Sequence, residues 1–173
     1  MALILPFDGN SPVIADSAFV APNGTVIGRV TLGERASVFY GAVLRGDMDA
    51  IDVGDDTNLQ DNVTVHVDHG TPATIGARVS VGHAAVLHGC TIEDDCLIGM
   101  SATVLNRAVV GSGSLVAAGS VVLEGTVIPP RSLVAGVPAK VRREITDEEF
   151  AKIQRNADSY LTLSAAHKLI AGS

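Results

Sequence analysis

Residues 92–134 read IEDDCLIGMSATVLNRAVVGSGSLVAAGSVVLEGTVIPPRSLV, and an aliphatic side chain recurs at every sixth position of this stretch. A helix would space its apolar residues three and four apart, and a half-buried strand would space them two apart. The fifth position of each hexad is also small or branched. A strict period of six therefore predicts a short strand and a corner, repeated around a prism. The leading aliphatic residues are Ile92, Ile98, Val104, Val110, Val116, Val122, Ile128 and Val134.

The same spacing extends backwards to residue 14, with three departures. Each departure comes directly after the hexad that begins at Leu44, Val65 or Leu87. The chain has no Trp, 3% aromatic residues and 18 glycines, so its repeated core has to be narrow. We predict one β-repeat unit over residues 1–139. The earlier leading residues are Ile14, Val20, Val26, Leu32, Val38, Leu44, Val53, Leu59, Val65, Ile75, Val81 and Leu87.

This repeat resembles that of the hexapeptide-repeat proteins, an all-β class that forms a left-handed parallel β-helix with three hexads in each triangular coil. The period of six comes from the sequence, whereas the handedness and the three-sided section are implied by the resemblance. Strands on successive coils would then stack about 4.8 Å apart, as in any sheet.

The sequence changes character after the last hexad. Thr146, followed three residues later by Glu149, is typical of a capping box. Apolar residues then recur at helical spacing, which predicts an amphipathic α-helix over 146–171 packed along the prism. Residues 140–173 are therefore interpreted as a connector followed by this helix. The apolar positions are Phe150, Ile153, Ala157, Tyr160 and Leu161.

Charge and composition exclude several classes of function. A net charge of −7 argues against nucleic-acid binding, because the chain has no basic surplus to release counterions. No apolar run is long enough to span a bilayer, so no membrane partner is expected. The opening residues MALILPFDGN lack the pattern of a signal peptide, which predicts a cytoplasmic protein. Cys90 and Cys96 are then expected to be buried free thiols.

Polar residues fall into two columns when the hexads are assigned to the faces of the prism. Arg45, His66 and His88 each occupy the second position of a hexad on one face, on three consecutive coils. Asp61 and His83 each occupy the third position on another face, also on consecutive coils. His66 and His88 are therefore predicted to lie close enough to share a metal, while His83 points elsewhere.

Three imidazoles with one open position form the ligand set of a catalytic zinc site. His83 can complete such a set only from a second copy of the chain. A closed cyclic assembly would bring one face of a subunit against another face of its neighbour, and a triangular prism predicts three subunits with three equivalent sites. Asp61 would then face Arg45 across the same seam.

Four segments resemble the γ-class carbonic anhydrases: LRGDMDAIDVGDDTNLQDNVTVH (44–66), VGHAAVLHGC (81–90), IGMSATVL (98–105) and NADSY (156–160). The resemblance covers nearly the whole chain. It implies a homotrimer that hydrates CO2 reversibly by means of a metal-bound hydroxide at the subunit interfaces. The implied metal is Zn²⁺, with Fe²⁺ or Co²⁺ as alternatives. The implied metal ligands are His66, His88 and the neighbour's His83.

The resemblance also implies roles for other residues. Arg45 and Asp61 match an intersubunit ion pair, and Asp47 matches an interface carboxylate. Asn58 and Gln60 match polar residues near the metal-bound water. Tyr160 matches a tyrosine that reaches over the site.

The sequence departs from the γ-class prototype in one region. The prototype carries an acidic loop, with glutamates assigned to proton export, between its first two histidine segments. This chain has only VDHGTPAT (67–74) there, and Met48 stands where a further glutamate would lie. Asp68 and His69 are candidates to take that role, although His69 and His167 lie off both columns and are interpreted as surface residues.

Two other readings stay open. Many hexapeptide proteins are acyltransferases, and some short relatives are associated with CoA-thioester hydrolysis. That chemistry needs one catalytic histidine and no metal. The other alternative is a catalytically weak, metal-binding assembly protein.

Overall fold

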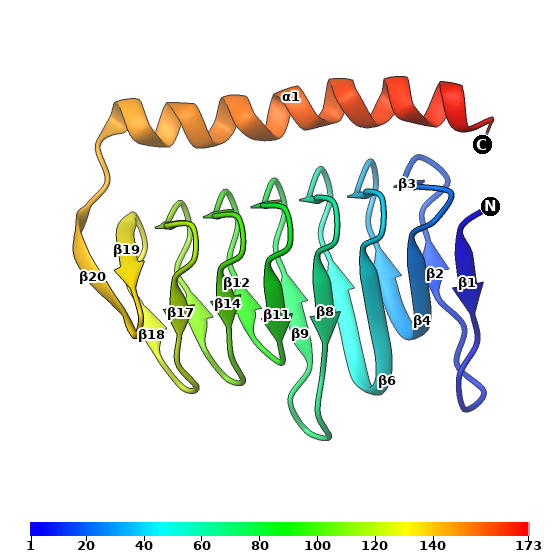
Figure 1. The fold of residues 1–173 in the computed structure, drawn as a ribbon, viewed down its shortest axis with the longest axis horizontal. Helices are drawn as coiled ribbons and strands as arrows, with labels where there is room; N and C mark the ends of the chain where they lie inside the picture. Colours follow the sequence, from blue (N-terminus) through cyan, green and yellow to red (C-terminus); the bar gives the residue numbers. More distant parts are fainter. Residues whose placement is uncertain (173) are drawn as a thin grey trace.

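The computed structural model describes residues 1–172 and shows a left-handed parallel β-helix with one long helix along its side (Figure 1). The predicted fold class is confirmed.

We name the three faces of the stack A, B and C. Face A contains the first part of β6 (Val43–Val53), β8 (Thr64–His66), β11 (Val86–His88), β14 (Thr103–Val104) and β17 (Val121–Val122). Face B contains the last part of β6, β9 (Ala73–Ile75), β12 (Thr91–Ile92), β15 (Val109–Val110) and β18 (Val127–Ile128). Face C contains β3 (Phe19–Val20), β5 (Ser37–Val38), β7 (Asn58–Leu59), β10 (Ser80–Val81), β13 (Leu97–Ile98), β16 (Leu115–Val116) and β19 (Ser132–Gly136).

Faces A and B are joined because two strands run around the corner between them. These are β4 (Thr25–Leu32) and β6, which pair with each other on both faces. The first departure from the period of six therefore lies inside β6. At the N-terminal end, β1 (Leu3–Leu5) and β2 (Val13–Ile14) add to β4 and begin the stack.

The core is formed by the leading aliphatic side chains, as the period predicts. From Val26 to Val134 every one of them is buried, whereas Ile14 and Val20 at the open end are half-buried. Burying a Val, Leu or Ile side chain contributes about 1.5–3 kcal/mol. Each coil therefore adds its own share of stability, and the backbone pairing between coils keeps the stack in register.

The second and third departures are turns on the edge between faces A and B. Residues 67–72 form a loop between β8 and β9 that projects beyond the other turns (Figure 1). An antiparallel bridge between Asp68 and Thr71 closes this loop. The third departure is a tight turn through Gly89, whose φ is +51°.

The predicted connector is partly a strand. Residues Ala139–Glu144 form β20, which pairs antiparallel with β19. A parallel stack leaves the strand edges of its last coil unpaired, and such edges invite association with other chains. Strand β20 covers this edge on face C by pairing with β19. The repeat pattern could not predict this strand, because β20 lies outside the repeat.

The C-terminal helix begins and ends at sequence signals. Helix α1 spans Asp147–Ala171, with Thr146 as its N-cap and Gly172 as its left-handed C-cap. The capping box is confirmed, because Thr146 Oγ1 accepts from Glu149 N and the Glu149 carboxylate accepts from Thr146 N. The helix runs back along the whole β-helix, so the two ends of the chain lie at the same end of the stack (Figure 1).

The face of α1 against the β-helix is less apolar than predicted. Its buried residues are Ile153, Ala157 and Ser164. Phe150 and Tyr160 are half-buried, and the Arg131 guanidinium lies 4.4 Å from the centre of the Phe150 ring.

The C-terminal half of α1 packs on aromatic side chains. His167 lies against Phe19 and Phe39, and its Nδ1 is 2.9 Å from the hydroxyl of Tyr40. Tyr160 meets Phe39 edge to face, with ring centres 5.4 Å apart. The interpretation of His167 as a surface residue is therefore wrong, because its ring helps to hold the helix in place.

The predictions about the cysteines and about membrane-spanning segments concern the described residues as follows. Cys90 and Cys96 are buried free thiols, and burial raises the pKa of each to about 12, so both stay protonated. Within residues 1–172, no helix is long and apolar enough to cross a membrane.

The helix start predicts a dependence of stability on pH. Hydrogen bonds from Arg143 and from the Thr146 N–H lower the pKa of Glu149 to about 2. A carboxylate with a depressed pKa stabilises the fold above its unfolded value and loses that contribution as the pH falls through the folded value. We expect stability to fall between about pH 4.5 and pH 2. Glu149→Gln should flatten this part of the curve, measured by chemical unfolding at each pH. An unchanged acid limb in Glu149→Gln would contradict the assignment.

Candidate metal centre

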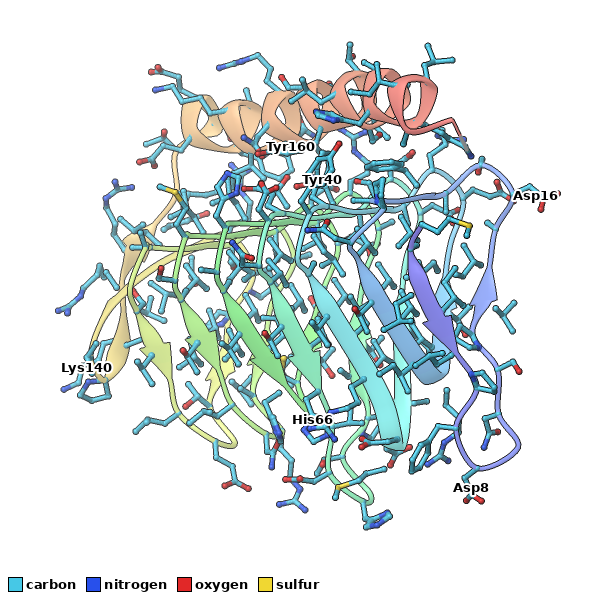
Figure 2. The ribbon with its side chains drawn as sticks, turned by 45° about the vertical axis from the view of Figure 1, so that its right-hand side comes forward. Asp8, Asp16, Tyr40, His66, Lys140 and Tyr160 are labelled. Atoms are coloured by element: carbon cyan, nitrogen blue, oxygen red, sulfur yellow. The ribbon has the colours of Figure 1, made fainter. Side chains whose placement is uncertain are left out.

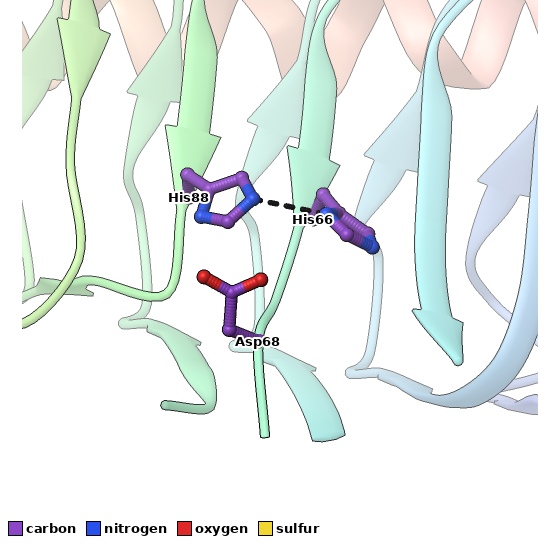
Figure 3. A group of neighbouring side chains, drawn as sticks. All are labelled: His66, Asp68 and His88. Atoms are coloured by element: carbon purple, nitrogen blue, oxygen red, sulfur yellow. Dashed lines mark hydrogen bonds between the residues drawn. The ribbon is translucent and has the colours of Figure 1, made fainter. Parts of the chain in front are cut away.

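His66 and His88 stand on top of each other on face A. They end β8 and β11, and the two strands pair so that His88 lies directly over His66, with Arg45 one coil below. His66 Nδ1 lies 2.9 Å from His88 Nε2, and the ring centres are 4.9 Å apart (Figure 3). The predicted column is observed, and both histidines turn one nitrogen towards a common point.

The outer nitrogen of His66 is held by a carboxylate. His66 Nε2 lies 3.0 Å from Asp47 Oδ1, while Arg45 donates to Asp47 Oδ2. Burial alone would raise the pKa of Asp47, but the hydrogen bonds from Arg45 and His66 outweigh it, so the pKa is lowered. Asp47 is therefore charged at neutral pH and fixes Nε2–H as the donor, which leaves His66 Nδ1 with its lone pair.

The outer nitrogen of His88 is held by an amide that the sequence analysis missed. His88 Nδ1 lies 2.7 Å from Asn106 Oδ1, and Asn106 Nδ2 donates to Asp68 Oδ2 at 2.8 Å. Gly89 makes room for this amide, because a Cβ there would lie 2.5 Å from Asn106 Oδ1. A glycine one coil below an asparagine is the signal that could have revealed this contact.

His83 lies on face C, away from the other two histidines. It follows β10 and stacks one coil above Asp61, whose Oδ2 lies 2.8 Å from His83 Nδ1. The hydroxyl of Tyr160 is 3.5 Å from His83 Nε2, so Tyr160 does lie over this histidine. Burial, and then the charge of Asp61, raise the pKa of Tyr160, which keeps the phenol neutral.

A cavity of about 400 Å³ opens beside His83, between face C and α1. Gln60 lines it, and Gln60 Nε2 donates to Asn58 Oδ1 at 3.0 Å. Asn58 is itself fixed by a hydrogen bond from its Nδ2 to Ser80 Oγ at 2.9 Å. Asn156 of α1 also lines the cavity, and its buried Oδ1 has no hydrogen-bond partner within the described part of the chain. Asn156 precedes Tyr160 by one helical turn and was not singled out from the sequence.

One chain thus carries two separate groups of candidate residues. Figure 2 places Tyr160, and with it the His83 region, under α1, whereas His66 lies at the opposite edge of the stack. Arg45 contacts Asp47 and Asp61 contacts His83, so the predicted Arg45–Asp61 pair is not formed within one chain. That pair stays a prediction about two chains.

The chemistry of the donors fits a divalent metal. A histidine that binds a metal usually donates its other ring N–H to a carboxylate, a carbonyl or water, which fixes the tautomer and the ring orientation. All three histidines have such an acceptor, namely Asp47 for His66, Asn106 for His88 and Asp61 for His83. The second nitrogen of each ring would then bind the metal, in place of its present contact with the other histidine or with Tyr160.

Comparison with known proteins decides the family. The chain is 42% identical over 168 residues to a carbonic anhydrase of Geobacillus kaustophilus, covering 97% of this chain and 92% of that protein. It is 47% identical over 163 residues to the mitochondrial γ carbonic anhydrase 2 of Arabidopsis thaliana. The chain belongs to the γ-class carbonic anhydrase family. It spans 59% of the length of the Arabidopsis member, so that protein has further sequence that this chain does not match.

Two further matches agree with the β-helix of this γ-class family member. Residues 89–124 match the model of the bacterial transferase hexapeptide family, described as six repeats. A solved structure of a hexapeptide transferase family protein from Anaplasma phagocytophilum superposes with a TM-score of 0.92 at 42% identity, covering 95% of this chain and 97% of that one. The family scaffold therefore also occurs in proteins described as transferases.

The contact between His88 and Asn106 gives a prediction. Asn106→Ala removes the acceptor that orients His88, and loss of such a partner typically lowers metal affinity 10- to 100-fold. We expect a loss of that size in competition titrations with a chelating dye. Asn23→Ala is the matched control, because Asn23 Oδ1 accepts from Gly41 N at another corner of the stack. Equal affinity in the two variants would contradict a role for Asn106.

Proposed function

We propose that this chain is a carbonic anhydrase that hydrates CO2 reversibly at metal sites shared by three identical subunits. His66 and His88 of one subunit and the partner's His83 would hold the ion, with Zn²⁺ as the expected metal and Fe²⁺ or Co²⁺ as alternatives. One observation carries the proposal. The two half-sites lie on different faces, and each of their imidazoles is oriented by an oxygen acceptor on its outer nitrogen.

The register of the coils supports the shared site. The His83 hexad lies between the hexads of His66 and His88 along the chain, so on a parallel neighbour it stands between them in height. By the same count, Asp61 stands between Arg45 and His66. A cyclic trimer that joins face C of each subunit to face A of the next would therefore form both the metal site and the Arg45–Asp61 pair.

The residues around the two half-sites suit CO2 hydration. A bound divalent metal acts as a Lewis acid that makes water nucleophilic at neutral pH. The amide nitrogen of Gln60 is engaged with Asn58, which is fixed in turn, so the Gln60 carbonyl oxygen would be the atom that accepts from a water. The cavity beside His83 is lined largely by apolar side chains and gives CO2 a place next to the reacting water.

The other expected properties remain part of the proposal. We also propose a cytoplasmic location, although the Arabidopsis relative is described as mitochondrial. The net charge of −7 fits a small-molecule substrate rather than a nucleic acid. A hexapeptide acyltransferase, a CoA-thioester hydrolase and a weakly active metal-binding assembly protein are the alternatives that the activity test has to separate.

Mixing two inactive variants tests the shared site. His66→Ala and His83→Ala should each lack CO2 hydration activity. Mixed trimers should regain it, because one of the three seams in each mixed trimer then joins an intact His66–His88 pair to an intact His83. The measurement is CO2 hydration by anaerobically purified protein loaded with Zn²⁺, Fe²⁺ or Co²⁺.

Mass spectrometry of the intact assemblies confirms that the subunits have mixed. Recovery supports the shared site, and its absence in confirmed mixed trimers would overturn it. Acyl transfer or thioester hydrolysis by metal-free protein, without CO2 hydration, would favour the rival enzymes. Metal binding with no turnover would favour the assembly protein.

The proposed seam continues above the metal as an apolar strip. Met100 stacks one coil above His83, is 56% exposed, and would face Leu105 of the partner subunit. Met100→Glu should place a charge in this contact and shift the trimer towards monomers, measured by analytical ultracentrifugation. Val127→Glu is the matched control, because Val127 is 71% exposed but lies on face B. Dissociation by both variants, or by neither, would contradict the proposed seam.

A further inference from the structure

Asp68 lies beside the two stacked histidines and was not assigned to the metal centre by the column argument. It sits in the loop 67–72 that follows His66. Figure 3 shows its carboxylate turned towards the space next to His66 and His88. One ligand atom from each of His66, Asp68 and His88 lies within 4.8 Å of the others. His83 is not part of this group.

The loop does not need the Asp68 carboxylate for its own structure. Its turn is closed by main-chain groups and one hydroxyl: Thr71 N donates to Asp68 O at 3.0 Å, and Asp68 N donates to Thr71 Oγ1 at 3.2 Å. The side chain of Asp68 is thus available for another purpose. One of its oxygens, Oδ2, accepts from Asn106 Nδ2, which orients the carboxylate.

Within residues 1–172 the second oxygen, Oδ1, has no such donor. Because Asn106 also holds His88 Nδ1, one amide orients both the histidine and the carboxylate. This pair of contacts resembles the outer-shell support of metal ligands, in which each ligand is fixed by a second hydrogen bond. If the Asp68 carboxylate served only to accept the hydrogen bond from Asn106, it would not need to lie so close to a nitrogen of each imidazole.

We propose that His66, His88 and Asp68 form a divalent-cation site within a single chain, with Asp68 as its third protein ligand. The inference rests on the proposed role of His66 and His88 as ligands and adds one that comes from the same subunit. Metal–ligand bonds to imidazole and carboxylate are about 2.0–2.2 Å long, so a small inward movement of the side chains would bring all three into contact with one ion.

The ligand set indicates which cations it takes. Two imidazoles and one carboxylate with open positions are typical of Fe²⁺ sites, and carboxylate oxygen favours harder ions than a set of three imidazoles does. The site should therefore accept Fe²⁺, Co²⁺ or Zn²⁺ in one chain before a neighbour arrives. His83 of the partner subunit would then add to an ion that is already bound.

The test measures Co²⁺ binding by its visible absorption, without any assay of activity. Four proteins are compared: the wild type, His83→Ala, Asp68→Asn and the double variant. Asp68→Asn is conservative, because an asparagine oxygen can still accept from Asn106. Asp52→Asn in the His83→Ala background is the matched control, since Asp52 is an exposed carboxylate on face B.

We expect His83→Ala to keep about one Co²⁺ per chain, and the double variant with Asp68→Asn to bind at least 10-fold more weakly. The Asp52→Asn control should bind like His83→Ala. The inference is overturned if His83→Ala binds no Co²⁺, or if Asp68→Asn leaves its affinity unchanged while thermal unfolding shows both to be folded.

These outcomes separate the inference from the proposed function. CO2 hydration by the wild type, together with no Co²⁺ binding by His83→Ala, would retain the shared site and remove the single-chain site. Co²⁺ binding that depends on Asp68, in a protein that does not hydrate CO2, would retain the single-chain site and remove the proposed reaction.

Discussion

The pairing of each strand with the strand one coil below is the constraint on which the candidate metal centre depends. His88 stands over His66 because β11 pairs with β8 in one register, and the Gly89 N–H donates to the His66 carbonyl directly after it. A slip of one residue would turn both imidazoles towards the other side of the sheet. The buried aliphatic rows prevent that slip, since it would also expose the leading residue of every hexad. Packing in the core and chemistry at the edge are thus set by the same register.

The period of six, together with the three-sided coil implied by the resemblance, was enough to predict the faces, the column of Arg45, His66 and His88, and the separate position of His83. It could do so because backbone pairing in a regular stack leaves no choice of neighbour. Asn106 and Asp68 were not predicted to meet, because Asp68 lies in a loop whose length breaks the period. Strand β20 lay outside the repeat altogether. Regular positions were therefore predictable from counting, whereas contacts made by irregular segments depend on how those segments fold.

The acceptors behind the three histidines are not equivalent. His66 and His83 face the carboxylates of Asp47 and Asp61, whereas His88 faces the neutral amide of Asn106. A carboxylate makes its imidazole a stronger donor to a metal than an amide does. The amide of Asn106 donates in turn to the carboxylate of Asp68. That carboxylate is turned towards the space next to the two imidazoles, so its negative charge would stabilise a cation there directly.

The two half-sites differ in what has to fold before they form. The His66–His88 group is built from neighbouring coils and the turns between them, so it needs only the central part of the β-helix. The His83 group also needs α1, which supplies Tyr160 and Asn156 and is held in place at its far end by His167 among the aromatic side chains. Docking of the last segment of the chain therefore completes the face that we propose to meet a neighbour. This order would couple assembly to the completion of folding, because a chain without its helix in place would present face A but an unfinished face C.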